Sequence, residues 1–171
     1  ALDFAKELRE AVDSVNPEIR LGLCTHNTWD MSGTDPLEIA IALAGNTKPF
    51  ARISGAPFRN LNVIPIVEFA RQQFAWGKDS GVELFAEGDT YPRPRMNVPS
   101  KPLELFELLL YADGTSDGIL AYLFDYYCNP DYEPGYVDRF CKNEYLRQGI
   151  KEMFSNKETV GVEVFGVAHK A

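Results

Sequence analysis

Residues 82–95 read VELFAEGDTYPRPR, an apolar run that leads directly into a long polar loop. The run is short and rich in residues that favour strands, and the loop is dense in charged and aromatic side chains. Glu87 lies where the run ends and the loop begins. This order of apolar strand, polar loop and helix recurs along the chain, and the recurrence predicts consecutive βα units.

Four apolar runs are predicted to be strands, over residues 19–25, 49–55, 82–87 and 118–124. Their ends are separated by about thirty to forty residues, which is the size of one βαβ repeat. The runs are continuously apolar rather than alternating, as in parallel sheets whose two faces are both covered. We therefore expect a parallel sheet with helices on its outside.

Apolar residues at helical spacing predict the helices between these strands. Asp35 is expected to cap a helix that starts at Pro36 and ends before Gly45. Ser100 is expected to cap a later helix. A long last helix is predicted from Tyr136 to about Phe154. The side chains that it is expected to bury are those of Val137, Phe140, Cys141, Tyr145 and Ile150.

Two architectures have this order of elements, an open doubly wound sheet and a closed (β/α)8 barrel. An open nucleotide-binding sheet would carry a glycine-rich first turn, and the sequence has neither GxGxxG nor GxxxxGK[ST]. We therefore predict an α/β fold, half of a (β/α)8 barrel, with four to five parallel strands, outer helices and no cofactor. The chain, residues 1–171, is expected to be one domain, with the barrel part over 17–155 and a tail strand over 159–168.

A complete barrel takes about 250 residues and eight strands. Half of one would leave two strand edges without partners, which is a liability for a sheet. The chain also begins at Ala1 inside a helical pattern, as a fragment would. We therefore expect the rest of a longer parent chain, or a second copy, to complete the barrel.

The composition excludes several classes of function. The net charge of -8 would repel phosphate backbones, which argues against a nucleic-acid partner. No apolar run reaches the roughly 18 residues that a membrane helix needs. The three cysteines, Cys24, Cys128 and Cys141, form no CxxC pair, and with only His26 and His169 beside them a Cys/His metal site is not expected. Reduced thiols in a cytoplasmic protein are the simpler interpretation.

The polar loop after residues 82–86 holds the main candidates for chemistry. Glu87 is the candidate catalytic residue, since a carboxylate at the carboxyl end of a barrel strand is well placed to act as acid, base or nucleophile. Asp89, Tyr91 and Arg93 follow it as candidate substrate-binding residues. Nearby arginines are expected to keep Glu87 ionised. The alternative is a structural ion pair between Glu87 and an arginine of this loop.

Three further groups complete the candidate site. Arg52 lies inside an apolar strand and should be paired, with Glu83 or Glu87 as its expected partner. Trp29 could stack on a sugar ring while its polar neighbours bind hydroxyl groups, but a hydrogen-bonded loop with one packed aromatic ring would look the same. Carbohydrate binding and plain packing are equally open for the tyrosine-rich loop after residue 124. The candidate binding residues of the two loops are His26, Asn27, Trp29 and Asp30, and Asp125 and Tyr126.

The run from LFAEGDTYPRPR through SKPLELFELLLYADGTSDGILAYLFDYY resembles the end of the barrel in the β-galactosidases of glycoside hydrolase family forty-two and in related glycosidase-like barrels. In that family the seventh strand ends in the nucleophilic glutamate, and Glu87 matches this position. Residues 112–117 match the turn that follows, and residues 119–124 match the eighth strand. The resemblance covers residues 82–138 and implies hydrolysis of O-glycosidic bonds in a carbohydrate substrate.

The sequence also departs from this family. Its eighth strand usually ends in a Trp-Arg type motif, whereas this chain has Phe124-Asp125-Tyr126. The family's acid/base glutamate follows the fourth strand, a region that would precede Ala1. Because a retaining glycosidase needs two carboxyl groups, we expect the isolated chain to be inactive. Two hypotheses remain: half of a barrel glycosidase with Glu87 as nucleophile, or a carbohydrate-binding or structural half-barrel without chemistry.

Overall fold

The computed structural model describes seven stretches of the chain, which are residues 1–25, 35–58, 61–89, 99–114, 116–123, 134–157 and 160–161. Its centre is a sheet of four parallel strands in the order β1-β2-β3-β4. The strands are β1 (Leu23–Cys24), β2 (Phe50–Arg52), β3 (Glu83–Gly88) and β4 (Gly118–Ala121). Three of them lie within their predicted runs, and β3 extends one residue beyond its run, to Gly88. The predicted tail strand, 159–168, falls almost entirely outside the described stretches.

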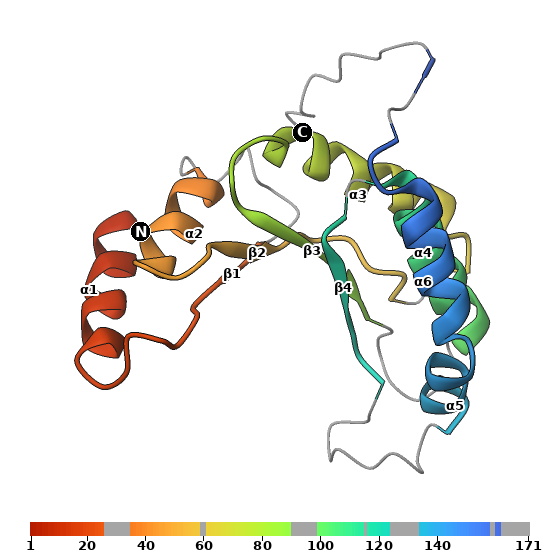
Figure 1. The fold of residues 1–171 in the computed structure, drawn as a ribbon, viewed down its shortest axis with the longest axis horizontal. Coiled ribbons are helices and arrows are strands. Elements are labelled where there is room, and N and C mark those ends of the chain that lie inside the picture. The colour runs from red at the N-terminus through yellow and green to blue at the C-terminus, as the bar shows by residue number, and fades with distance from the viewer. Residues whose placement is uncertain are drawn as a thin grey trace.

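Six helices accompany this sheet in the described stretches. Figure 1 shows them following an arc around the strands, from α1 and α2 over α3 to α4, α5 and α6. Their bounds are α1 (Leu2–Asp13), α2 (Pro36–Ala44), α3 (Ile64–Gly77), α4 (Ser100–Asp113), α5 (Pro134–Lys142) and α6 (Glu144–Phe154). None of the helices in the described residues is long and apolar enough to cross a membrane.

The strand order confirms the predicted fold class. Spatial order follows chain order without a reversal, and consecutive strands are joined through α2, α3 and α4. A doubly wound sheet reverses its strand order at a switch point, whereas consecutive right-handed βαβ units place all helices on one side. The chain is therefore an α/β protein whose all-parallel sheet has the arrangement of a partial (β/α)8 barrel.

Side-chain alternation gives the sheet two different faces. On one face the strands bury small and aliphatic side chains against α2, α3 and α4, with Phe74 and Phe106 at the centre of the core. The strand residues of this outer face are Ala51, Ile53, Leu84 and Ala86. The opposite face, which we call the inner face, follows from the registers Cys24–Arg52, Arg52–Phe85 and Glu87–Leu120. It carries Cys24, Phe50, Arg52, Glu83, Phe85, Glu87, Leu120 and Tyr122.

Large and small residues fit together on the inner face. The rings of Phe50 and Phe85 meet edge to face with their centroids 6.1 Å apart. Each ring occupies the space above a glycine of the neighbouring strand segment, Gly22 for Phe50 and Gly118 for Phe85. A Cβ atom at Gly118 would lie 3.0 Å from the Phe85 ring. This alternation fills one layer of the inner face, as side chains fill the layers of a barrel interior.

Capping was predicted correctly for one helix and wrongly for another. The Oδ1 atom of Asp35 accepts a hydrogen bond from the backbone N–H of Leu37 at 2.8 Å, so Asp35 caps α2 as expected. Ser100 is instead the first residue of α4, after Pro99. Its hydroxyl oxygen accepts a hydrogen bond from Arg139 Nε at 3.2 Å. A tertiary contact with α5 has therefore taken the side chain that a cap would use.

A single helix was predicted from Tyr136 to Phe154, but the structure has two helices, because the helix is interrupted at Asn143. Asn143 has φ -104° and ψ 16°, and its amide nitrogen donates to Glu104 Oε1 on α4. The break changes which side chains face α4. Cys141 and Tyr145, both expected to be buried, are exposed, and Arg147 is buried instead.

Candidate active site

Glu87 and Arg52 form an ion pair at the end of the sheet where the parallel strands have their carboxyl ends. We call this end the carboxyl edge and the opposite end the amino edge. Glu87 lies near the end of β3, and Arg52 is the last residue of the neighbouring β2. Arg52 Nη1 and Glu87 Oε1 are 2.6 Å apart. Both side chains are largely shielded, with exposed fractions of 16% for Arg52 and 9% for Glu87. The pairing of Arg52 with a carboxylate of β3 is confirmed, and Glu87 rather than Glu83 is the partner.

Burial dominates the electrostatics of Glu87. It raises the pKa of the Glu87 carboxyl group above its ordinary value, the positive charge of Arg52 opposes this, and the nearby charge of Asp89 adds to the increase. The net shift of the Glu87 pKa is therefore upward. Arg52 acts in the expected direction, but desolvation is the larger effect.

The guanidinium group of Arg52 has a further donor, Nε, besides the Nη1 atom that binds Glu87. Its Nε atom is buried and has no hydrogen-bond partner among the residues that the structure describes. A buried donor without an acceptor is costly, so this group calls for a partner such as a water, an ion or a ligand atom. Arg52 can thus donate to Glu87 through Nη1 while its Nε donates to an oxygen atom that lies outside the described residues.

The opposite end of β3 carries a second charged cluster with a different character. Glu83 accepts hydrogen bonds from Arg20 Nη2 at 2.6 Å and from Lys48 Nζ at 2.7 Å. These two contacts lower the pKa of the Glu83 carboxyl group. Arg20 also stacks on the ring of Phe50, with its Cζ atom 4.9 Å from the ring centroid. The amino edge of the sheet is therefore held by a structural ion cluster, and the carboxyl edge is the candidate site.

Gln73 of α3 positions the chain just beyond β2, and sequence reasoning did not single it out. Its side chain is 1% exposed. Its Nε2 atom donates to the carbonyl oxygen of Ser54 at 2.6 Å, and its Oε1 atom accepts from the Ser54 N–H at 3.3 Å. Gln73 lies three residues after Ala70 and beside Phe74, on the apolar side of the helix. A polar residue on that face was the signal that could have revealed it.

Most of the predicted binding residues lie outside the described residues, and the structure places only Arg52, Glu87 and Asp89 of the set. The described residues that lead into the three candidate loops are Thr25, Asp89 and Leu123, which follow β1, β3 and β4. Because the strands are parallel, the three loops start from one edge of the sheet. The eight candidates without a described position are His26, Asn27, Trp29, Asp30, Tyr91, Arg93, Asp125 and Tyr126.

The described residues hold no group of three or more histidine, cysteine, aspartate or glutamate side chains that could bind a metal ion. Among the described residues, the Arg52–Glu87 pair is therefore the candidate site. The chain matches no protein-family model, no curated protein and no solved structure.

Proposed function

We propose that this chain forms part of a (β/α)8-type barrel that hydrolyses O-glycosidic bonds, with Glu87 as the nucleophile. One observation carries the proposal: Glu87 lies at the carboxyl end of a parallel strand, on the inner face, and Arg52 on the next strand holds it at 2.6 Å. This is the edge at which barrel enzymes assemble their catalytic groups. The family resemblance of the surrounding segment assigns the same role to Glu87.

In the proposed reaction a carboxylate oxygen of Glu87 attacks the anomeric carbon of the sugar as the glycosidic bond breaks. A second carboxyl group, from the segment or subunit that completes the barrel, gives its proton to the departing oxygen. Water then displaces the sugar from Glu87, and the second group takes a proton from that water. Arg52 orients Glu87 through one oxygen and favours its ionised form, which the attack requires.

The proposal includes the setting and the partners of the protein. The partners are a carbohydrate substrate and either the rest of a longer parent chain or a second copy of this chain. Cys24 and Cys141 are both exposed free thiols. Free surface thiols are typical of a reducing compartment, so we place the protein in the cytoplasm.

A non-catalytic carbohydrate-binding or structural half-barrel is the second candidate. It is favoured by the shielding of Glu87, whose side chain is 9% exposed and whose Oε1 atom is already engaged by Arg52. A buried Arg–Glu pair of this kind can hold two strands together without any part in catalysis. The two candidates differ in what happens when the Glu87 carboxylate is removed.

The experiment that separates them measures turnover of a panel of aryl glycosides by the full-length protein. Glu87→Gln should lower kcat by several orders of magnitude, because it removes the covalent path. Glu83→Gln is the matched control, since Glu83 lies on the same strand and face but at the other edge. Addition of azide to Glu87→Gly should restore release of the aryl group and yield a glycosyl azide. Equal turnover by wild type and Glu87→Gln would exclude the nucleophile role, and turnover by neither would favour the scaffold.

A further inference from the structure

The segment that follows β2 is held firmly against the carboxyl edge of the sheet. The N–H of Ile53 donates to the carbonyl oxygen of Phe85 at 2.8 Å, and Gln73 binds both backbone groups of Ser54. Gly55 has a φ of +114°, which glycine adopts easily and other residues rarely do. The backbone is therefore guided along one path away from Arg52.

Phe58, a few residues further on, has an unusual backbone conformation. Its φ is +46°, which is rare for a bulky residue. Its N–H donates to the carbonyl oxygen of Asp89 at 3.0 Å, and Asp89 is two residues beyond Glu87. Ala56 and Pro57 are buried, whereas Phe58 is 38% exposed. The turn thus buries its small residues, leaves Phe58 partly exposed, and is tied through the Phe58 backbone to the end of β3.

Folding alone does not account for this arrangement. Glycine or asparagine would adopt the same φ at lower cost, and an exposed ring recovers only part of the free energy of burying an aromatic side chain. Strained residues that the surrounding structure holds in place are concentrated at binding and catalytic sites. The hydrogen bond from Phe58 to Asp89 fixes the strained residue to the strand that carries Glu87.

We propose that Phe58 is a stacking platform for a sugar ring bound next to the one that Glu87 attacks, an inference that rests on the function proposed above. The C–H groups of a pyranose form an apolar face that can lie on an aromatic ring, and its hydroxyl groups point outward to polar partners. Sites for such ligands combine aromatic surfaces with a few polar groups that fix orientation. Phe58 supplies the surface, and Arg52, whose side chain is 16% exposed, supplies a charged group at the same end of the sheet.

The test compares 4-nitrophenyl monosaccharides with the corresponding 4-nitrophenyl disaccharides in the full-length protein. Phe58→Ala and Phe58→Gly should raise KM for the disaccharides by tenfold or more and leave kcat close to its original value. For the monosaccharides KM should hardly change, because they do not reach the platform. Phe58→Tyr keeps the ring and should preserve both constants. Trp76→Ala removes an exposed aromatic residue from α3 and is the control.

A second readout separates binding from a purely structural role. Glycine accepts the φ of Phe58 without strain, so Phe58→Gly should remain folded, as a cooperative thermal transition would show, while it weakens disaccharide binding. An unchanged disaccharide KM in a folded Phe58→Gly protein would overturn the platform. The loss of turnover in Glu87→Gln would still stand in that case. Absence of both turnover and binding of lactose, cellobiose and maltose by wild type would overturn the platform and the glycosidase proposal together.

Discussion

Two glutamates on one strand have opposite environments. Glu83 and Glu87 are four residues apart on the inner face of β3. Glu83 lies at the amino edge between two partly exposed cations, and its pKa is lowered. Glu87 lies at the carboxyl edge, shielded and with one cation, and its pKa is raised. Environments that move two carboxyl pKa values apart give the groups different roles. Under the proposed function, Glu83 has a structural role and Glu87 the chemical one.

The balance at Glu87 gives a prediction for Arg52. Arg52 favours the ionised carboxylate, so Arg52→Gln should raise the pKa of Glu87 further. Because the nucleophile must be ionised, the acidic limb of the pH profile of kcat/KM should move to higher pH. The full-length protein is assayed between pH 4 and 9, with Arg20→Gln as the control for loss of a strand-linking arginine at the other edge. An acidic limb that stays in place in Arg52→Gln would mean that Arg52 does not influence the reacting carboxylate.

Among the elements, α4 and α6 are joined by a buried pair of opposite charges. Glu107 of α4 is 3% exposed and Arg147 of α6 is 4% exposed, with Oε2 and Nη1 3.9 Å apart. The Oε1 atom of Glu107 is buried and has no partner among the described residues. Arg147 has nearer partners: it donates to Glu144 at 2.8 Å and lies 3.8 Å from the centroid of the Phe140 ring. Glu107 is therefore the less well satisfied member of the pair.

This pair predicts how stability depends on pH. Burial raises the pKa of Glu107 from 4.5 to about 7 in the folded protein, against the opposing charge of Arg147. In the unfolded chain the group loses its proton near pH 4.5, so the folded state binds the additional proton between the two values. The free energy of unfolding should therefore fall as pH rises from about 4.5 to about 7, by up to about 3 kcal/mol from this group.

Denaturation at pH 5 and pH 7.5 measures this effect. Glu107→Gln keeps the shape of the side chain without its charge, so it should flatten the dependence and stabilise the protein at pH 7.5 relative to wild type. Glu104→Gln is a neighbouring comparison on the same helix, where Arg139 at 2.9 Å already compensates the carboxylate. A wild-type stability that rises over this pH range, or an unchanged slope in Glu107→Gln, would contradict the assignment.

The elements also show how far sequence patterns reach. Apolar runs located all four strands, and the Asp35 cap located the start of α2, because both signals are local. The break at Asn143 and the burial of Arg147 depend on carboxylates of α4 some forty residues away. A helical repeat of apolar residues carries no information about such partners. The same holds for the candidate site: a charge inside an apolar strand predicted a partner for Arg52, whereas the desolvation of Glu87 needs the three-dimensional surroundings.

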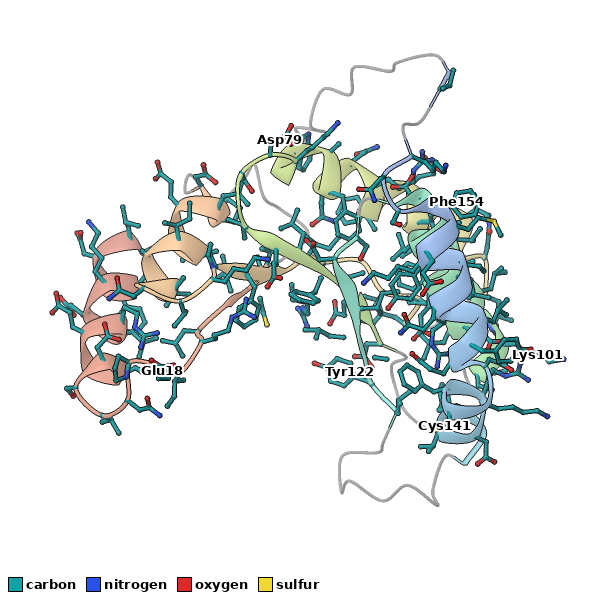
Figure 2. The ribbon with its side chains drawn as sticks, viewed as in Figure 1. Glu18, Asp79, Lys101, Tyr122, Cys141 and Phe154 are labelled. Carbon is teal, nitrogen blue, oxygen red and sulfur yellow. The ribbon has the colours of Figure 1, made fainter. Side chains whose placement is uncertain are left out.

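At the scale of the whole molecule, the inner face and its two edge strands are incompletely covered. Leu120 and Tyr122 of the β4 segment are 41% and 39% exposed, and Cys24 on β1 is exposed. Figure 2 shows Tyr122 at the end of β4, on the side of the strand away from α4 and α6. In a closed barrel these positions would be interior. Exposed strand edges beside apolar side chains favour pairing with another chain.

We therefore expect the isolated chain to self-associate, with the inner face shielded in the assembly. The net charge of -8 opposes contact between copies, so association should strengthen as salt screens the charge. Cys128 is first replaced by serine, so that Cys24 and Cys141 are the two remaining thiols. Light scattering of this protein at high micromolar concentration should give a mass above that of one chain. Alkylation of Cys24 on the inner face should then be at least tenfold slower than alkylation of Cys141 on the outer helix α5, since both thiols are exposed in the single chain.

A substitution on the inner face tests whether the mass measured by light scattering and the alkylation rate of Cys24 report the same association. Leu120→Lys places a charge on the inner face of an edge strand, a device by which natural sheets prevent pairing. It should shift the assembly to single chains and bring the alkylation rate of Cys24 up to that of Cys141. Leu105→Lys changes an exposed leucine on α4, outside the sheet, and should leave both measurements as in wild type. A wild-type chain that stays monomeric in high salt, with Cys24 as reactive as Cys141, would mean that the half-barrel is stable with its inner face open to solvent. A second copy would then not complete the barrel, and the second carboxyl group of the proposed reaction would have to come from the rest of a longer parent chain or from the loops of this chain.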